Sequence, residues 1–175
     1  MKLNHLMIAG ALSLFSMIAS AAEPLVTFVC TGNTGRSPMA EALASDLIRK
    51  DGLNVLVQSR GVNVDPKETT PEKGTVTVLK ERGIDISHHQ ATQLTQADVD
   101  TSTLLLTMTQ GHKDKILANF PAAKGKVYTL AEFAANRQED LSDPYGKPLE
   151  AYRTVEKQLD ELLPLALKKI SQDKK

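Results

Sequence analysis

The chain has 175 residues, of which 41% are hydrophobic and 24% charged. This balance is typical of one folded domain and excludes a disordered or multi-span membrane protein. Basic and acidic residues number 21 each, so the overall charge does not favour nucleic acid or an anionic membrane as a partner, and any anion recognition must be local.

The N-terminal segment has the pattern of a secretory signal peptide. A lysine precedes an apolar run at residues 6–18, small residues follow, and no acidic residue occurs before Glu23. The run is shorter than the ~20 residues of a spanning helix, which favours cleavage after Ala21 over an uncleaved membrane anchor. We therefore expect a cleaved signal peptide at 1–21, a folded domain at 22–175, and an exported protein, periplasmic or secreted, without stable membrane insertion after cleavage.

Strand and helix patterns alternate along the rest of the chain. Apolar, β-branched runs predict strands at 25–29, 55–57, 104–108 and 127–130. Helix signals occur at Ser37-Pro38, at Thr70-Pro71, over 112–119 and in the C-terminal segment, and Ser37 is the expected N-cap of the first helix, with Pro38 at its first position. The longest irregular stretch is 60–70. This alternation predicts a single α/β domain, a parallel sheet with helices on both faces.

The C-terminal helix carries one apolar stripe. Its residues are Tyr152, Val155, Leu159, Leu162, Leu163, Ala166 and Ile170. Pro164 lies inside this pattern and should kink the helix or end its regular hydrogen bonding.

A loop rich in turn residues joins the first strand to the first helix. It reads CTGNTGRS from Cys30 to Ser37, which has the form C-x5-R-S. Successive backbone N–H groups in a tight loop, together with a helix N-terminus, form a concave site for a tetrahedral phosphate. Gly32 and Gly35 permit the backbone angles that such a loop needs. The sequence therefore predicts a phosphate-binding loop after the first strand, where parallel sheets bind ligands.

The side chains of this loop suit phosphoryl transfer. Cys30 is the only cysteine, so it is either a reactive thiol or a buried apolar residue. The positive field of the loop would favour a thiolate that attacks phosphorus. Arg36 can give two parallel hydrogen bonds to phosphate oxygens, and Ser37 could donate a hydrogen bond to the sulfur.

A phosphocysteine mechanism needs an acid that protonates the leaving group. The best candidate is Asp143, which precedes Pro144 in the turn sequence DPYG. Tyr145 in the same turn either forms an aromatic wall of the cleft or packs on its own loop.

Two separated motifs, VCTGNTGRSPMAE at 29–41 and DPYG at 143–146, resemble the low-molecular-weight protein-tyrosine-phosphatase family. The resemblance implies a four-stranded parallel sheet, a phosphocysteine intermediate, no metal or other cofactor, and Asp143 as acid and then base. Asn33 would brace the loop. His88 would belong to a hydrogen-bond network behind it or be a surface histidine, and His89 has no matching role. The expected catalytic residues are Cys30, Arg36 and Asp143, and the expected substrate-binding residues are Thr31, Gly32, Asn33, Thr34, Gly35, Ser37 and Tyr145.

Two loop positions depart from the commonest pattern of this family. Many members have a second cysteine where this chain has Gly35, so Cys30 cannot form an internal protective disulfide. Thr34 stands where the tyrosine phosphatases usually have isoleucine, and the protein-arginine phosphatase branch resembles this chain in having threonine. The threonine hydroxyl could contact a guanidinium, or the side chain could only fill space.

The sequence leaves the substrate and the oligomeric state open. Phosphotyrosine or phosphoarginine on a protein and a small phosphate ester are all compatible with the loop. Arsenate reduction is disfavoured because it relays electrons through additional cysteines, and the chain lacks nucleotide-binding fingerprints. A phosphate- or phosphopeptide-binding module without turnover is the non-enzymatic alternative, but the presence of all three catalytic residues favours an enzyme.

Overall fold

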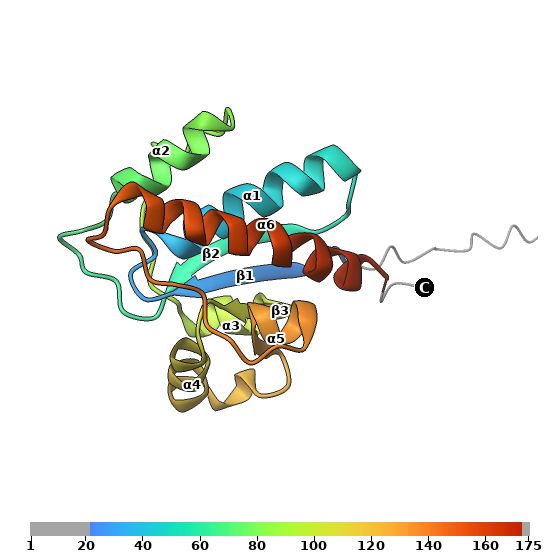
Figure 1. The fold of residues 1–175 in the computed structure, drawn as a ribbon. Coiled ribbons are helices and arrows are strands. Elements are labelled where there is room, and N and C mark those ends of the chain that lie inside the picture. The colour runs from blue at the N-terminus through green and yellow to red at the C-terminus, as the bar shows by residue number, and fades with distance from the viewer. Residues whose placement is uncertain (1–21, 173–175) are drawn as a thin grey trace, which may run out of the picture.

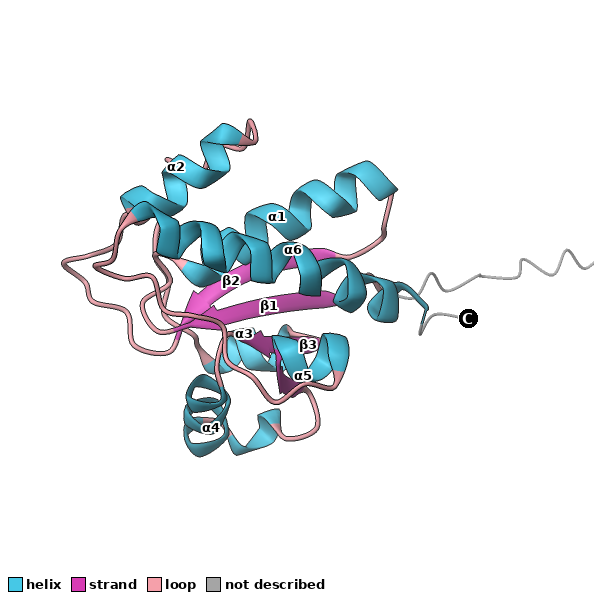
Figure 2. Ribbon diagram, in the orientation of Figure 1, coloured by secondary structure: helices cyan, strands magenta, loops and turns pink. Residues whose placement is uncertain are grey.

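The computed structural model describes residues 22–172, so the predicted signal peptide lies outside the described residues. Strands and helices alternate along the chain, as Figures 1 and 2 show. In chain order the elements are β1 (Leu25–Cys30), α1 (Arg36–Asp51), β2 (Leu56–Gly61), α2 (Lys73–Glu81), α3 (Gln96–Thr101), β3 (Leu104–Thr107), α4 (Gln110–Asn119), the 3₁₀ helix η1 (Pro121–Ala123), β4 (Val127–Thr129), α5 (Leu130–Ala135) and α6 (Leu149–Gln172).

The strands form one four-stranded parallel sheet in the order β2-β1-β3-β4. This confirms the single α/β domain and the four-stranded sheet that the sequence predicts. The last residue of β1, Cys30, lies opposite Gly61 at the end of β2. Because β1 has β2 on one side and β3 on the other, the strand order reverses at β1, and ligands of open α/β sheets bind at such a point.

Alternate residues of the strands supply two apolar cores. Val26 and Phe28 of β1 and Leu106 of β3 pack in the larger core with α1, α2, α5 and α6. Val29 and Leu105 point the other way, into the smaller core with α3 and α4. In Figure 1, α1 and α6 lie on one side of β1 and α3 and α4 on the other. Side chains of a strand alternate between its faces, so both faces of this sheet are covered, as predicted.

Helix α1 begins at Arg36, and its N-cap is Gly35. The prediction that Ser37 caps this helix with Pro38 at its first position is therefore wrong by two positions. Pro38 is still tolerated, because the first four N–H groups of a helix have no intrahelical partner. Ser37 is therefore the second residue of α1, and its side chain is buried in contact with Cys30 and Asn33.

Strand β2 extends further than its apolar residues indicate. The sequence predicts a strand at 55–57, whereas β2 runs to Gly61 through three polar residues. Their side chains have partners: Gln58 donates to the Thr27 hydroxyl at 2.9 Å, and Ser59 donates to a Glu41 oxygen at 2.5 Å. The irregular stretch accordingly begins only after Gly61.

The sequence analysis did not predict the two short helices α3 and α5. Each begins with a capping box, Thr95 with Asp98 and Thr129 with Glu132. The capping box is a sequence signature of a helix start, so this signal was available. The predicted strand at 127–130 ends one residue early because Thr129 caps α5.

Helix α6 passes through Pro164 without ending. The predicted apolar stripe of this helix is buried in the larger core, as is Leu167. Burial of one complete face against α1 and α5 stabilises the helix beyond its propensity, which offsets the hydrogen bond that proline removes. No helix within residues 22–172 has the length and apolar character needed to cross a membrane.

Candidate active site

Three loops at the carboxyl ends of the strands enclose a cleft of about 230 Å³. They are the loop after β1, the segment after β2 and the segment before α6, which gather at the left end of the sheet in Figure 1. The cleft is lined by Cys30, Thr31, Gly32, Thr34, Gly35, Arg36, Asn63, Asp65, Glu68, Glu72, Asp143, Pro144 and Tyr145. The fold thus brings the Cys30 loop and the Asp143 turn together although more than one hundred residues separate them.

Cys30 is buried, and its Sγ lies 2.9 Å from the Ser37 Oγ. This is the contact that the sequence predicts for Ser37. Within the described part of the chain, the backbone N–H groups of residues 32–35 donate no hydrogen bond. A sulfur nucleophile therefore lies beside a row of free backbone donors, the arrangement that binds a tetrahedral anion.

Asn33 braces this loop from behind, as the family resemblance implies. It is buried with a positive φ of 57°, and asparagine tolerates this conformation better than most residues. Its Nδ2 donates to the Ser37 and Ser59 hydroxyls at 2.9 and 3.0 Å, and its Oδ1 accepts from the Thr92 N–H at 2.9 Å. Three anchors on one side chain fix the loop conformation.

The histidine behind the loop is His89, whereas the family resemblance implied His88 there, with a surface position for His88 as the alternative. The Nε2 of His89 lies 2.8 Å from the Asn33 carbonyl oxygen, and His88 is exposed. The expectation for His88 as a member of the network is therefore wrong. The two neighbouring side chains differ in their surroundings, since one contacts the loop and the other is exposed. Their positions in the sequence could not show which of them contacts the loop.

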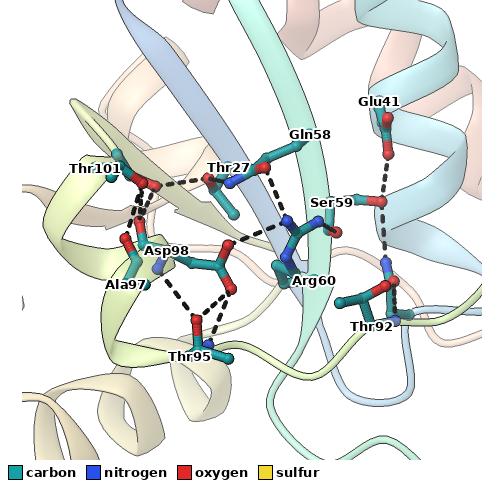
Figure 3. Close-up of polar contacts among 12 residues, drawn as sticks. Thr27, Glu41, Gln58, Ser59, Arg60, Thr92, Thr95, Ala97, Asp98 and Thr101 are labelled. Carbon is teal, nitrogen blue, oxygen red and sulfur yellow. Dashed lines mark hydrogen bonds and ion pairs between the residues drawn. The ribbon is translucent and has the colours of Figure 1, made fainter.

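The network continues to the first helix and the second strand. Ser59 joins Asn33 to Glu41 of α1, and Figure 3 shows Glu41, Ser59 and Thr92 in this arrangement. The Arg60 guanidinium forms a 3.1 Å ion pair with Asp98 of α3. The end of β2, which supports the loop, is thus tied to helices on both faces of the sheet.

Arg36 is buried, and its guanidinium is oriented by the Asp143 segment. One nitrogen donates to the Leu141 carbonyl at 3.3 Å, and another lies 3.6 Å from an Asp143 oxygen. Asp143 is 61% exposed, so its carboxyl reaches into the open part of the cleft. The two predicted charged residues therefore meet across the site.

His112 of α4 supports the loop from the smaller core. It is buried, and its Nε2 lies 2.8 Å from the Thr31 Oγ1. Its Nδ1 has no hydrogen-bond partner among the described residues. Burial, reinforced by the positive charge of Arg36, lowers the pKa of His112 to about 4, so the ring is neutral near pH 7. No sequence pattern indicated this role, because the helix prediction marked His112 only as a helical residue.

Thr34 contacts a residue that the sequence analysis missed, Glu72. The Thr34 hydroxyl donates to Glu72 Oε1 at 3.0 Å, and Tyr152 of α6 donates to Glu72 Oε2 at 2.7 Å. Glu72 directly follows Thr70-Pro71, in the segment that leads from the carboxyl end of β2 to α2. Strand β2 is a neighbour of β1 in the sheet. The position of this loop beside the phosphate-binding loop, rather than its residue types, could have indicated that Glu72 lines the cleft.

The cleft carries more negative than positive side chains. Asp65, Glu68, Glu72 and Asp143 line it, and Arg36 is the single basic residue of the lining within the described chain. Tyr145 is 57% exposed at this rim, and its hydroxyl donates to Glu68 at 3.0 Å. No cluster of three or more histidine, cysteine or acidic side chains suited to a metal ion occurs in residues 22–172.

Comparison with known proteins identifies the family. Residues 25–175 match the model of the low molecular weight phosphotyrosine protein phosphatase family. A protein-arginine-phosphatase of Geobacillus stearothermophilus is 41% identical over 83% of this chain and 95% of that protein. The low molecular weight protein-tyrosine-phosphatase PtpB of Staphylococcus haemolyticus is 35% identical over 77% of this chain and 91% of that protein.

Solved structures agree with these sequence matches. The YwlE arginine phosphatase of Geobacillus stearothermophilus superposes with a TM-score of 0.78 at 39% identity, over 86% of this chain and 94% of that one. A mutant YwlE arginine phosphatase with a phosphorylated active-site serine superposes with a TM-score of 0.82 at 36% identity, over 86% and 97%. With this agreement over nearly the whole described domain, the chain belongs to the low molecular weight phosphotyrosine protein phosphatase family and is a cysteine-dependent phosphatase.

Proposed function

We propose that this phosphatase hydrolyses phosphoarginine on proteins. The observation that carries the proposal is the lining of the cleft, which contains four carboxylates and the Thr34 side chain together with a single arginine among the described residues. Carboxylates and hydroxyls accept hydrogen bonds from the N–H groups of a guanidinium, and the negative charge suits its positive charge. The names of the similar arginine phosphatases support the same substrate class.

The proposed reaction has two steps. In the first, the Cys30 thiolate forms a bond to phosphorus as the P–N bond of phosphoarginine breaks, and protonated Asp143 gives its proton to the leaving guanidine nitrogen. In the second, water attacks the phosphocysteine, Asp143 takes a proton from that water, and the S–P bond breaks. Inorganic phosphate leaves, and the thiolate is restored.

The remaining loop groups would hold the transferring phosphoryl group. Arg36 is buried and already oriented by the Leu141 carbonyl, so it can offer two parallel N–H groups to phosphate oxygens. The free N–H groups of residues 32–35 would bind the other oxygens. The Ser37 hydroxyl, 2.9 Å from Cys30 Sγ, would donate to the thiolate when it forms and when it leaves.

The ratio of kcat/KM for a phosphoarginine peptide and for a phosphotyrosine peptide of the same sequence tests the proposal, with Cys30→Ser as the inactive blank. We expect a clear preference for phosphoarginine. Thr34→Val keeps the side-chain volume and removes the hydroxyl, so it should lower this ratio. A wild-type preference for phosphotyrosine would reduce Thr34 to a packing role and refute the arginine assignment.

Phosphotyrosine is the second candidate substrate. The exposed ring of Tyr145 at the cleft rim offers a surface for stacking an aromatic substrate, and other similar proteins are named tyrosine phosphatases. Turnover of neither peptide would favour a small phosphate ester or a binding module without activity.

We also propose that the protein is exported and that residues 1–21 are removed. The proposal rests on the sequence pattern of that segment. Fractionation of cells that express the full chain, followed by N-terminal sequencing of the purified protein, tests it. An N-terminus at Ala22 in the exported fraction is expected, and an intact Met1 in the cytoplasmic fraction would contradict the proposal.

A further inference from the structure

Glu72 is attached to the phosphate-binding loop by its backbone. Its N–H donates to the Thr34 carbonyl oxygen at 2.8 Å. Glu72 is also the N-cap of α2, yet its side chain makes no capping hydrogen bond with that helix. The carboxylate is turned instead toward the cleft, which it lines.

Both oxygens of this carboxylate have a fixed hydroxyl partner. Oε1 accepts from Thr34 at 3.0 Å and Oε2 accepts from Tyr152 at 2.7 Å. Burial, followed by the hydrogen bond to Glu72, raises the pKa of Tyr152, so the phenol keeps its proton and stays a donor. Thr34 and Tyr152 are both less than a tenth exposed, and two buried donors hold the carboxylate in one orientation.

This arrangement decides what the Thr34 hydroxyl can offer to a ligand. A hydroxyl has one proton and two acceptor lone pairs. Because the proton of Thr34 is given to Glu72, only its lone pairs are left for a molecule in the cleft. A guanidinium N–H can donate to such an acceptor, whereas the ester oxygen and ring of phosphotyrosine have no proton to give.

The Glu72 carboxylate also places negative charge beside the loop. A side-chain carbon on residue 35 would lie 2.6 Å from Glu72 Oε1 and 2.8 Å from its carboxyl carbon, so the absence of a side chain at Gly35 leaves room for this group. A negative charge this close to an anion-binding loop weakens the binding of phosphate alone. It favours a substrate that carries positive charge next to its phosphoryl group.

From these contacts we propose that Glu72 is a specificity-determining residue. Held by Tyr152, it orients the Thr34 hydroxyl as an acceptor and supplies negative charge, and both effects select a guanidinium over a phenol as the leaving group. Glu72 positions Thr34 and does not take part in proton transfer. This inference rests on the proposed arginine phosphatase function.

The test compares Glu72→Gln and Glu72→Ala with the wild type by the ratio of kcat/KM for phosphoarginine and phosphotyrosine peptides. Glutamine keeps an oxygen that accepts from Thr34 and removes the charge, and alanine removes both. We expect the ratio to fall by about tenfold or more in Glu72→Ala, the effect of losing one charge-assisted hydrogen bond, and by less in Glu72→Gln. Should the alanine variant not fold, Tyr152→Phe, which removes one anchor of Glu72, should lower the ratio in the same direction.

Glu81→Gln is the matched control, because Glu81 lies on the same helix and pairs with Arg153 of α6 away from the cleft. It should leave the ratio unchanged. The inhibition constant of inorganic phosphate is a second readout: it should fall in both Glu72 variants, whereas damage to the loop would raise it.

The two proposals fail in different ways. A wild type that prefers phosphoarginine, combined with Glu72 variants of unchanged ratio, overturns the role of Glu72 and leaves the proposed function standing. A wild type without that preference overturns the proposed function and the role of Glu72 with it.

Discussion

The buried imidazole of His112 should make the protein lose stability in mild acid. In an unfolded chain, histidine has a pKa near 6.5, and in the folded protein the value for His112 is lowered to about 4. The unfolded state therefore binds a proton more readily than the folded state between these two values. Stability is complete above the unfolded pKa and falls as the pH decreases through this window.

The size of the effect follows from the same two values. At pH 5.5, one unit below the unfolded value, the loss should be about 1.4 kcal/mol, or roughly a tenfold rise in the unfolded fraction. Carboxylates with lowered pKa values, among them Asp98 and Glu132, add their own losses, but only closer to their ordinary values near 4. Between pH 7.5 and 5.5 the change in stability therefore reports the titration of histidine rather than of carboxylates.

Urea unfolding followed by circular dichroism at several pH values between 7.5 and 5.5 measures this loss. The matched variant is His112→Gln, which does not titrate in this range and whose longer side chain can place an amide atom near the Nε2 position that contacts Thr31. Its unfolding free energy should vary less with pH than that of the wild type by about the amount given above. A flat wild-type profile, or equal slopes in the two proteins, would show that His112 is not held neutral by its surroundings.

Three further predictions concern packing and chemistry. Gly74→Ala should destabilise the protein by about 1–3 kcal/mol in urea unfolding, although alanine favours helices, because its Cβ would collide with the Tyr152 ring; a gain in stability would contradict this packing. Asp143→Asn should lower kcat about 10²–10⁴-fold, and a variant as active as the wild type would remove Asp143 from the role of acid. Peroxide treatment followed by dithiothreitol should recover little activity, because Cys30 has no internal cysteine partner; complete recovery measured by the same assay would oppose this expectation.

The contact between Gly35 and Glu72 links two departures of this chain from the commonest family pattern. A side chain at residue 35 would meet the Glu72 carboxylate, so a cysteine there would require Glu72 to move away from Thr34 and Tyr152. In this chain the Glu72 carboxylate therefore lies where the side chain of a protective cysteine would begin. The same arrangement leaves Cys30 without a neighbouring thiol in the loop and places the negative charge of Glu72 at the cleft.

The sequence by itself determined the fold class and the phosphate-binding loop. Strand and helix periodicity and the glycines of the loop are local features, so they can be recognised without knowledge of distant contacts. The CTGNTGRS loop and the distant DPYG turn identified Cys30, Arg36 and Asp143 as candidate catalytic residues. The apolar stripe of α6 was equally readable, because a buried helix face repeats at helical spacing.

Only the tertiary structure decided which side chains surround that loop. Glu72 meets Thr34 across 38 residues, and His112 meets Thr31 across 81. Such contacts depend on how β2 and β3 flank β1 and on the direction of each loop, which residue types do not encode locally. The choice of His89 over His88 has the same cause, since the path of the turn determines which of the two side chains reaches the Asn33 carbonyl. The chemistry of the site was thus readable from two short segments, whereas the contacts that we propose to set its selectivity arise only on folding.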